Sequence, residues 1–124
     1  MTALALEFDS TAEDGHAILM AATGFLETQG AYDPDIELAL AEAINNIVDH
    51  AYADPGLAAL RLETSQTDVV CVLTDSGQTF VPPGMDHAPG YGWHLIRALT
   101  KAVNVQRLGE TNRMTLIFQR PDLA

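Results

Sequence analysis

The sequence predicts a two-layer α/β sandwich (α+β class) in which helices cover one face of a mixed, mostly antiparallel sheet. Strand-like apolar segments occur near the start, in the middle and at the end of the chain. Two long segments with helical apolar spacing follow the first strand, and a shorter one precedes the last two strands. With 124 residues, 48% of them hydrophobic, we expect residues 1–124 to form one domain around a single core.

The first third of the chain predicts one strand and two helices. Residues 4–8 alternate between large apolar side chains and alanine or glutamate, which indicates a strand. Residues 11–29 place apolar side chains on one side of a helix. A second helix is expected over residues 33–53, because Asp33 can cap its first turn and Pro34 suits that turn.

The middle of the chain predicts two strands and a long loop. Residues 60–65 alternate as in a half-buried strand, and residues 69–74 are apolar and β-branched, as in a central strand. Residues 76–90 contain three prolines and three glycines and are expected to form a loop. A loop of that length in a small domain is usually functional.

The last third predicts a short helix and a closing hairpin. The helix is expected over residues 91–101. Residues 103–105 and 114–118 are expected to pair as strands around a turn at residues 109–112. Together these elements give a sheet with its helices stacked on one face.

Charge is distributed unevenly along the chain. Residues 1–60 contain eleven acidic residues and no lysine or arginine, whereas the remainder is balanced, so the net charge of −11 comes from the first half. Without a basic stripe, a nucleic-acid partner is not expected. The acidic half is either a solvated surface or a docking face for a basic partner.

Neither a membrane-spanning segment nor a signal peptide is apparent in the sequence. Cys71 is the single cysteine, in an apolar strand, and is read as a small buried hydrophobe. These features predict a cytoplasmic protein without a membrane partner.

Three polar residues of the second helix form the first candidate site. Glu42, Asn46 and His50 are four residues apart and share one helix face. Glu42 could accept a proton from an attacking hydroxyl, or be an ordinary exposed glutamate. Asn46 offers an oxygen of the kind that Mg²⁺ prefers, or is a buried hydrogen-bonding amide. His50 could touch phosphate or simply hold the helix end, and no second histidine at ligand spacing supports zinc.

Two glycine-containing segments complete the candidate site. Asp75 ends the central strand, where its carboxylate could accept a hydrogen bond from an exocyclic amine such as that of adenine. Gly77 would let a flat base approach the backbone. Gly90 and Gly92 open a helix, where backbone N–H groups and the helix dipole favour an anion. The alternatives are a strand-to-loop turn and an ordinary loop end.

The order and spacing of these segments resemble the GHKL (Bergerat-fold) histidine-kinase-like ATPases, most closely the bacterial anti-sigma-factor serine/threonine-protein kinases. The resemblance covers roughly residues 33–120. The matching motifs are Glu42-Ala-x-x-Asn46-x-x-x-His50-Ala-Tyr52 for the N box, Asp75-x-Gly77-x-x-Phe80-x-Pro82 for the first glycine box, and Gly90-x-Gly92-x-x-Leu95-Ile96 for the second.

This resemblance implies roles at the base and metal sites. Glu42 would be the general base that activates the acceptor serine or a water, and Asn46 would ligate Mg²⁺. Asp75 would bind the adenine amine of ATP, with Gly77 beside the base.

The resemblance also implies phosphate contacts and partners. Gly90 and Gly92 would cradle the phosphates, His50 would belong to the nucleotide-binding set, and Thr115 on the last strand would face the adenine. The implied function is an ATP- and Mg²⁺-dependent serine kinase that binds a sigma factor and phosphorylates an anti-sigma-factor antagonist in a partner-switching pathway. Members of the family commonly form homodimers.

Two departures from the family pattern keep a second function open. Trp93 stands where a smaller aliphatic residue is usual, and only twelve residues separate Gly77 from Gly90. The alternative is a non-catalytic regulator that binds nucleotide, or none, and acts by sequestration. A third reading is a hydrolase or a catalytic domain of a histidine-kinase relay.

Overall fold

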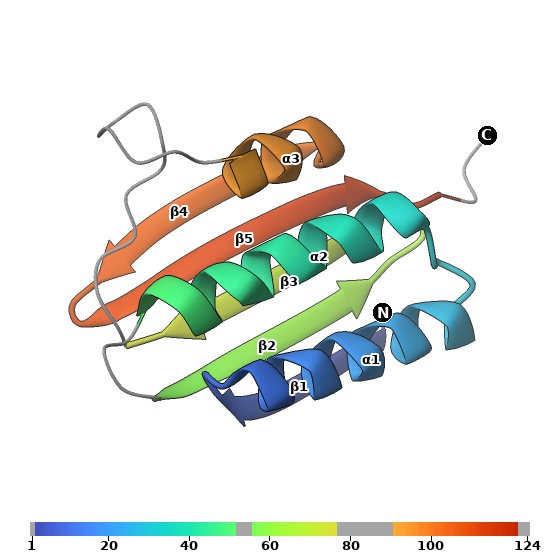
Figure 1. Ribbon diagram of the computed structural model, residues 1–124. Coiled ribbons are helices and arrows are strands. Elements are labelled where there is room, and N and C mark those ends of the chain that lie inside the picture. The colour runs from blue at the N-terminus through green and yellow to red at the C-terminus, as the bar shows by residue number, and fades with distance from the viewer. Residues whose placement is uncertain (1, 52–55, 77–90, 122–124) are drawn as a thin grey trace.

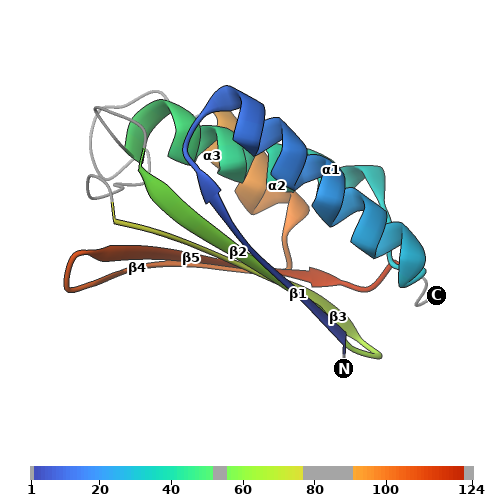
Figure 2. The ribbon, with the colours of Figure 1, turned by 90° about the horizontal axis from the view of Figure 1, so that it is seen from below.

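Three helices lie on one face of a five-stranded sheet. The computed structural model describes residues 2–51, 56–76 and 91–121. In chain order the elements are β1 (Thr2–Asp9), α1 (Ala12–Thr28), α2 (Pro34–Asn46), the π-helical turn η1 (Ile47–Ala51), β2 (Leu57–Thr64), β3 (Asp68–Asp75), α3 (Tyr91–Leu99), β4 (Ala102–Leu108) and β5 (Thr111–Gln119). The helices are all on the same side of the sheet (Figures 1 and 2), which confirms the predicted two-layer architecture.

The strand order is β1-β2-β3-β5-β4, so the last strand enters the sheet between β3 and β4. Each of these four pairings is antiparallel. The parallel component that the sequence prediction allowed is therefore not found among the described strands. The predicted central position of β3 is confirmed.

The core lies between the sheet and the helices. Along β2 and β3 every second side chain is buried, because successive side chains of a strand point to opposite faces. The largest fully buried side chains come from both layers: Leu26, Leu40, Ile44, Leu60, Leu62, Leu73, Ile96 and Leu116. No helix in the described parts of the chain combines the length and the apolar character needed to cross a membrane.

Local capping explains where α1 and α2 begin. The Thr11 side chain accepts a hydrogen bond from the backbone N–H of Asp14 at 3.1 Å, and Asp14 accepts one from the N–H of Asp9 at 3.0 Å. At α2, the Asp33 side chain accepts from the N–H of Asp35 at 2.7 Å and Pro34 occupies the first turn. Each cap satisfies a helix N–H that has no partner within the helix.

The second helix does not stay regular to its end. After Asn46 it widens into the π-helical turn Ile47–Ala51, in which bonds join residues five apart. Beyond Asn46, residues four apart therefore no longer point in the same direction around the helix axis. The predicted alignment of His50 with Glu42 and Asn46 assumed a regular α-helix, and that assumption is wrong for this last turn.

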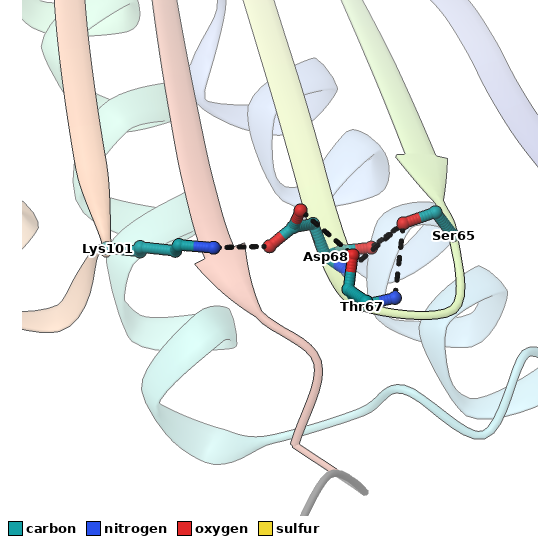
Figure 3. A network of polar contacts seen from close by, with 4 residues as sticks. All are labelled: Ser65, Thr67, Asp68 and Lys101. Carbon is teal, nitrogen blue, oxygen red and sulfur yellow. Dashed lines mark hydrogen bonds and ion pairs between the residues drawn. The ribbon is translucent and has the colours of Figure 1, made fainter.

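A polar network fastens one end of the sheet (Figure 3). The Ser65 hydroxyl accepts hydrogen bonds from the backbone N–H groups of Thr67 and Asp68, at 3.3 and 3.1 Å. The Lys101 ammonium donates to the Asp68 carboxylate at 3.1 Å, and this bond lowers the pKa of Asp68. The network thus joins the β2–β3 turn to the start of β4.

Candidate functional site

Several sequence-predicted site residues gather at the opposite end of β3. The end of β3, the start of β5 and the C-terminal end of α2 lie at the same end of the molecule (Figure 1). From Asp68 to Asp75, β3 spans about 23 Å at a strand rise of about 3.3 Å per residue. The candidate site is therefore well separated from the polar network at Lys101.

Glu42 and Gly92 are in direct proximity although they are fifty positions apart in the sequence. A β-carbon placed on Gly92 would lie 2.6 Å from Glu42 Oε2 and 3.5 Å from Glu42 Cδ. Gly92 is in the first turn of α3, so the carboxylate of Glu42 lies against the N-terminal end of that helix. Only glycine permits this approach. The structure thus brings together the predicted base and the second glycine segment.

Asn46 is the last residue of α2 and follows Glu42 by one α-helical turn, so both lie on the same face. Asn46 is half-buried, whereas its neighbour Asn45 is exposed. The structure therefore separates the two adjacent amides, with Asn46 on the Glu42 side of the helix.

An amide oxygen next to a carboxylate is a donor set suited to Mg²⁺, which takes few protein ligands and completes its shell with water and phosphate oxygens. Among the residues that the structure describes, no three histidine, cysteine, aspartate or glutamate side chains form a metal-binding cluster. A metal held by Asn46 would complete its shell with water and substrate phosphate oxygens.

Asp75 is buried and hydrogen-bonded across the sheet. The residue is 8% exposed, and its Oδ1 accepts a hydrogen bond from Asn112 Nδ2 at 2.9 Å. Asn112 is 5% exposed and stands opposite Asp75 in the β3–β5 ladder. Arg107, on β4, donates from Nη1 to Asn112 Oδ1 at 3.0 Å and from Nε to the Gly109 carbonyl at 3.0 Å.

Asn112 is a residue that sequence reasoning missed. We expected it in the turn at residues 109–112, but the turn is confined to Gly109 and Glu110, and β5 begins at Thr111. Gly109 makes the tight turn feasible, since its φ is +64°. Counting back by twos from the buried Leu116 would have placed Asn112 on the helix-covered face and marked it as a polar residue on a buried face.

Thr115 does not belong to this group, and the expectation that it faces the adenine is wrong. Asn112 and Leu116 are both buried on the helix-covered face, and the β3–β5 register is continuous from Asn112 onward. Because strand side chains alternate, Thr115 lies on the other face of the sheet, opposite Val72. No helix covers that face in the described structure (Figure 2).

The remaining predicted residues are placed only in part. Gly77 and Gly90, and the expected loop between them, lie outside the described residues. The backbone of His50 belongs to η1, but its side chain is also outside them. Trp93, whose size departs from the expected pattern, is 8% exposed and belongs to the hydrophobic core.

Comparisons with known proteins bear on the family and the fold of this chain. Residues 8–119 match the sequence model of the family described as histidine kinase-like ATPase domain. A stretch of 46 residues is 41% identical to the serine-protein kinase RsbW of Halalkalibacterium halodurans, covering 37% of this chain and 28% of that protein. The chain thus matches less than a third of the length of this relative.

The fold itself has a solved counterpart. A crystal structure of the RsbU and RsbW domains of Rv1364c from Mycobacterium tuberculosis superimposes with a TM-score of 0.75 and 21% sequence identity. The match covers 98% of this chain and 34% of that longer one. At this identity the likeness establishes the shared fold.

Proposed function

The chain belongs to the family of histidine kinase-like ATPase domains, and on this premise we propose that it is an ATP- and Mg²⁺-dependent protein serine kinase. It would act as an anti-sigma factor in a partner-switching pathway and phosphorylate an anti-sigma-factor antagonist. The observation that carries the proposal is the contact between Glu42 and Gly92. It sets a carboxylate at the N-terminal end of a helix, which is where phosphate groups are favourably bound.

Phosphoryl transfer requires few reactive groups from the protein. In phosphoryl transfer the enzyme mainly positions the reactants and stabilises charge. The serine oxygen attacks the γ-phosphorus, its proton passes to the Glu42 carboxylate, and the bond to the β,γ-bridging oxygen breaks, so that ADP leaves with the electron pair. Mg²⁺ held by Asn46 would neutralise phosphate charge. Asp75, beneath the site, would accept a hydrogen bond from the adenine amine.

The partner assignment rests on the family resemblance and on charge. The relative that matches part of this chain is a serine-protein kinase, and the first sixty residues supply the whole net charge of −11. Exposed acidic residues lie along β1, α1, α2 and η1: Glu7, Glu13, Glu27, Asp35 and Asp49. We propose that the protein is a cytoplasmic homodimer. The acidic first sixty residues of the chain would dock a basic surface of the sigma factor or the antagonist.

Transfer of labelled phosphate tests the proposal. The purified chain is incubated with [γ-³²P]ATP, Mg²⁺ and candidate antagonists captured from its host. We expect acid-stable phosphoserine on one of them. Phosphohistidine, which acid destroys, would instead indicate a histidine-kinase relay.

Variants at Glu42 test the mechanism. Because Glu42 is the proposed base, Glu42→Ala and Glu42→Gln should lower transfer by roughly a hundredfold or more while ATP binding persists. Glu63→Gln, on β2 and outside the acidic first sixty residues, serves as the matched control. Transfer by Glu42→Ala at the wild-type rate would refute the assigned mechanism.

The alternative of a non-catalytic sequestering regulator is less well supported. One of its two motives is the bulky Trp93, which the structure accounts for by core packing. The other, the short spacing between Gly77 and Gly90, lies outside the described residues. Calorimetric titration with ATP and Mg²⁺ separates the two functions. Absence of both binding heat and a thermal shift would favour sequestration alone.

A further inference from the structure

We propose that Asn112 is a positioning residue for the purine base, that it acts through Asp75, and that Arg107 sets its orientation. This inference rests on the proposed function, because it concerns the same nucleotide site. It assigns selectivity for a base with an exocyclic amine to a three-residue chain, Arg107–Asn112–Asp75, which crosses strands β4, β5 and β3.

Two hydrogen bonds of the Asn112 amide fix its orientation. A guanidinium can only donate hydrogen bonds and an ionised carboxylate can only accept them. The amide oxygen must therefore face Arg107 Nη1, at 3.0 Å, and the amide nitrogen must face Asp75 Oδ1, at 2.9 Å. In a flipped amide, the nitrogen would face the guanidinium donors of Arg107 and the oxygen would face the carboxylate of Asp75. Arg107 therefore disfavours the flipped orientation.

This bond in turn restricts the Asp75 carboxylate. Both Asp75 and Asn112 are buried, so their bond is shielded from competing water. With Oδ1 held toward β5, rotation of the carboxylate is restricted before a ligand arrives. A preformed acceptor favours a base that presents an amine, such as adenine, over one that presents an oxo group, such as guanine.

The β4–β5 hairpin carries an internal control for Arg107. Arg113 also bonds to an amide side chain, that of Gln106, at 2.7 and 3.2 Å. Arg113 follows Asn112 directly on β5, so it lies on the opposite face of the sheet. Both arginines lie in the same hairpin and both donate to an amide side chain. They differ in the face of the sheet on which they lie.

The experiment measures dissociation constants for Mg²⁺-ATP and Mg²⁺-GTP by isothermal titration calorimetry and compares their ratio. The variants Asn112→Thr and Asn112→Val are compared. Threonine and valine side chains have nearly the same shape, but only threonine offers a hydrogen-bond donor. We expect Asn112→Val to lower the ATP preference by roughly five- to tenfold and Asn112→Thr to retain most of it. Arg107→Met should lower the preference severalfold, and Arg113→Met should leave it unchanged.

A purely structural role would lower thermal stability without changing the ratio, so unfolding temperatures are recorded for every variant. If Asn112→Val does not fold, the Arg107→Met and Arg113→Met pair decides the question. If Arg107→Met and Arg113→Met bind ATP and show the same ratio of ATP to GTP dissociation constants, this inference is overturned. The kinase proposal would still stand. A wild-type protein that binds neither nucleotide would overturn both.

Discussion

The carboxylate of Glu42 occupies the space that a side chain at position 92 would need. A β-carbon there would lie 2.6 Å from Glu42 Oε2, which is the far end of a flexible side chain. We therefore expect Gly92→Ala to fold with a stability within about 1 kcal/mol of wild type, since Glu42 can swing away. Phosphoryl transfer should fall by roughly ten- to a hundredfold, because the proposed base is displaced.

Thermal unfolding and the labelled-phosphate assay together check this prediction. Gly24→Ala is the matched control, since Gly24 is in α1 and a β-carbon there would meet no atom within 4 Å. The control should be stabilised by about 0.5–1 kcal/mol and keep full transfer. Wild-type transfer by Gly92→Ala would show that the contact has no part in catalysis.

Cys71 offers a second test at the level of one side chain. Burial raises the pKa of its thiol to about 12, so the reactive thiolate is almost absent at neutral pH. We expect the native protein to react with a thiol reagent at pH 8 at least about a hundredfold more slowly than the urea-unfolded chain. Rapid labelling of the folded protein would contradict the burial of Cys71.

Residue by residue, the sequence shows which side chains are candidates for the site more readily than it shows where they lie. Glu42 and Asp75 were recognisable because each is an acidic residue at the edge of an apolar pattern. Asn112 was not recognisable as a site residue, because Gly-x-x-Asn is typical of turns. The local pattern cannot show that the turn has only two residues. Thr115 was misassigned for a related reason, since its face depends on the strand register.

Among the elements, α2 is the one whose position matters most for the candidate site, because it carries both Glu42 and Asn46. Its start depends on Asp33, whose side chain accepts a hydrogen bond from the Asp35 N–H at 2.7 Å. We expect Asp33→Ala to lower the free energy of unfolding by about 1 kcal/mol, whereas Asp33→Asn, which can still cap, should lower it much less. Urea denaturation measures both, and equal losses would show that capping is not the cause.

The sequence predicted each helix and strand but not how α2 ends. Apolar spacing and the cap at Asp33 were sufficient for the start of the helix. A π-helical turn has no comparable signal, because it depends on how the helix end packs in the folded protein. The regular spacing assumed for His50 therefore failed where tertiary structure overrides the local pattern.

For the whole molecule, the ion pair between Lys101 and Asp68 makes stability depend on pH. The bond from Lys101 lowers the pKa of Asp68 below its ordinary value of 3.8. The contribution is therefore fully present above that value and is lost as the pH falls through the lowered pKa. We expect Lys101→Met to be less stable than wild type at pH 7, and the difference to shrink toward zero as Asp68 becomes protonated.

Chemical denaturation between pH 2 and pH 7 measures this dependence. Arg97→Met is the control, since Arg97 is an exposed cation in the last turn of α3. If the Lys101→Met deficit persisted unchanged at pH 2, the lost interaction would have to be something other than the pair with Asp68.

At this scale the fold class was predictable and the strand order was not. Amphipathic helices and alternating strands require a layered packing, whatever the pairing. The insertion of β5 between β3 and β4 depends on contacts between distant parts of the chain, which local periodicity does not encode. The same long-range pairing brings Asn112 to Asp75, which is why that contact became visible only in the folded structure.

The position of β5 also fixes when a nascent chain can first recognise its nucleotide. Both ladder neighbours of β5 are synthesised before it, and Asn112 is its second residue. Until that segment leaves the ribosome, Asp75 is at an open edge without its cross-strand partner, and β4 has no strand beside it. Nucleotide recognition should therefore begin only once β5 has been synthesised, so a chain stalled before that strand would neither hold ATP nor compete for it.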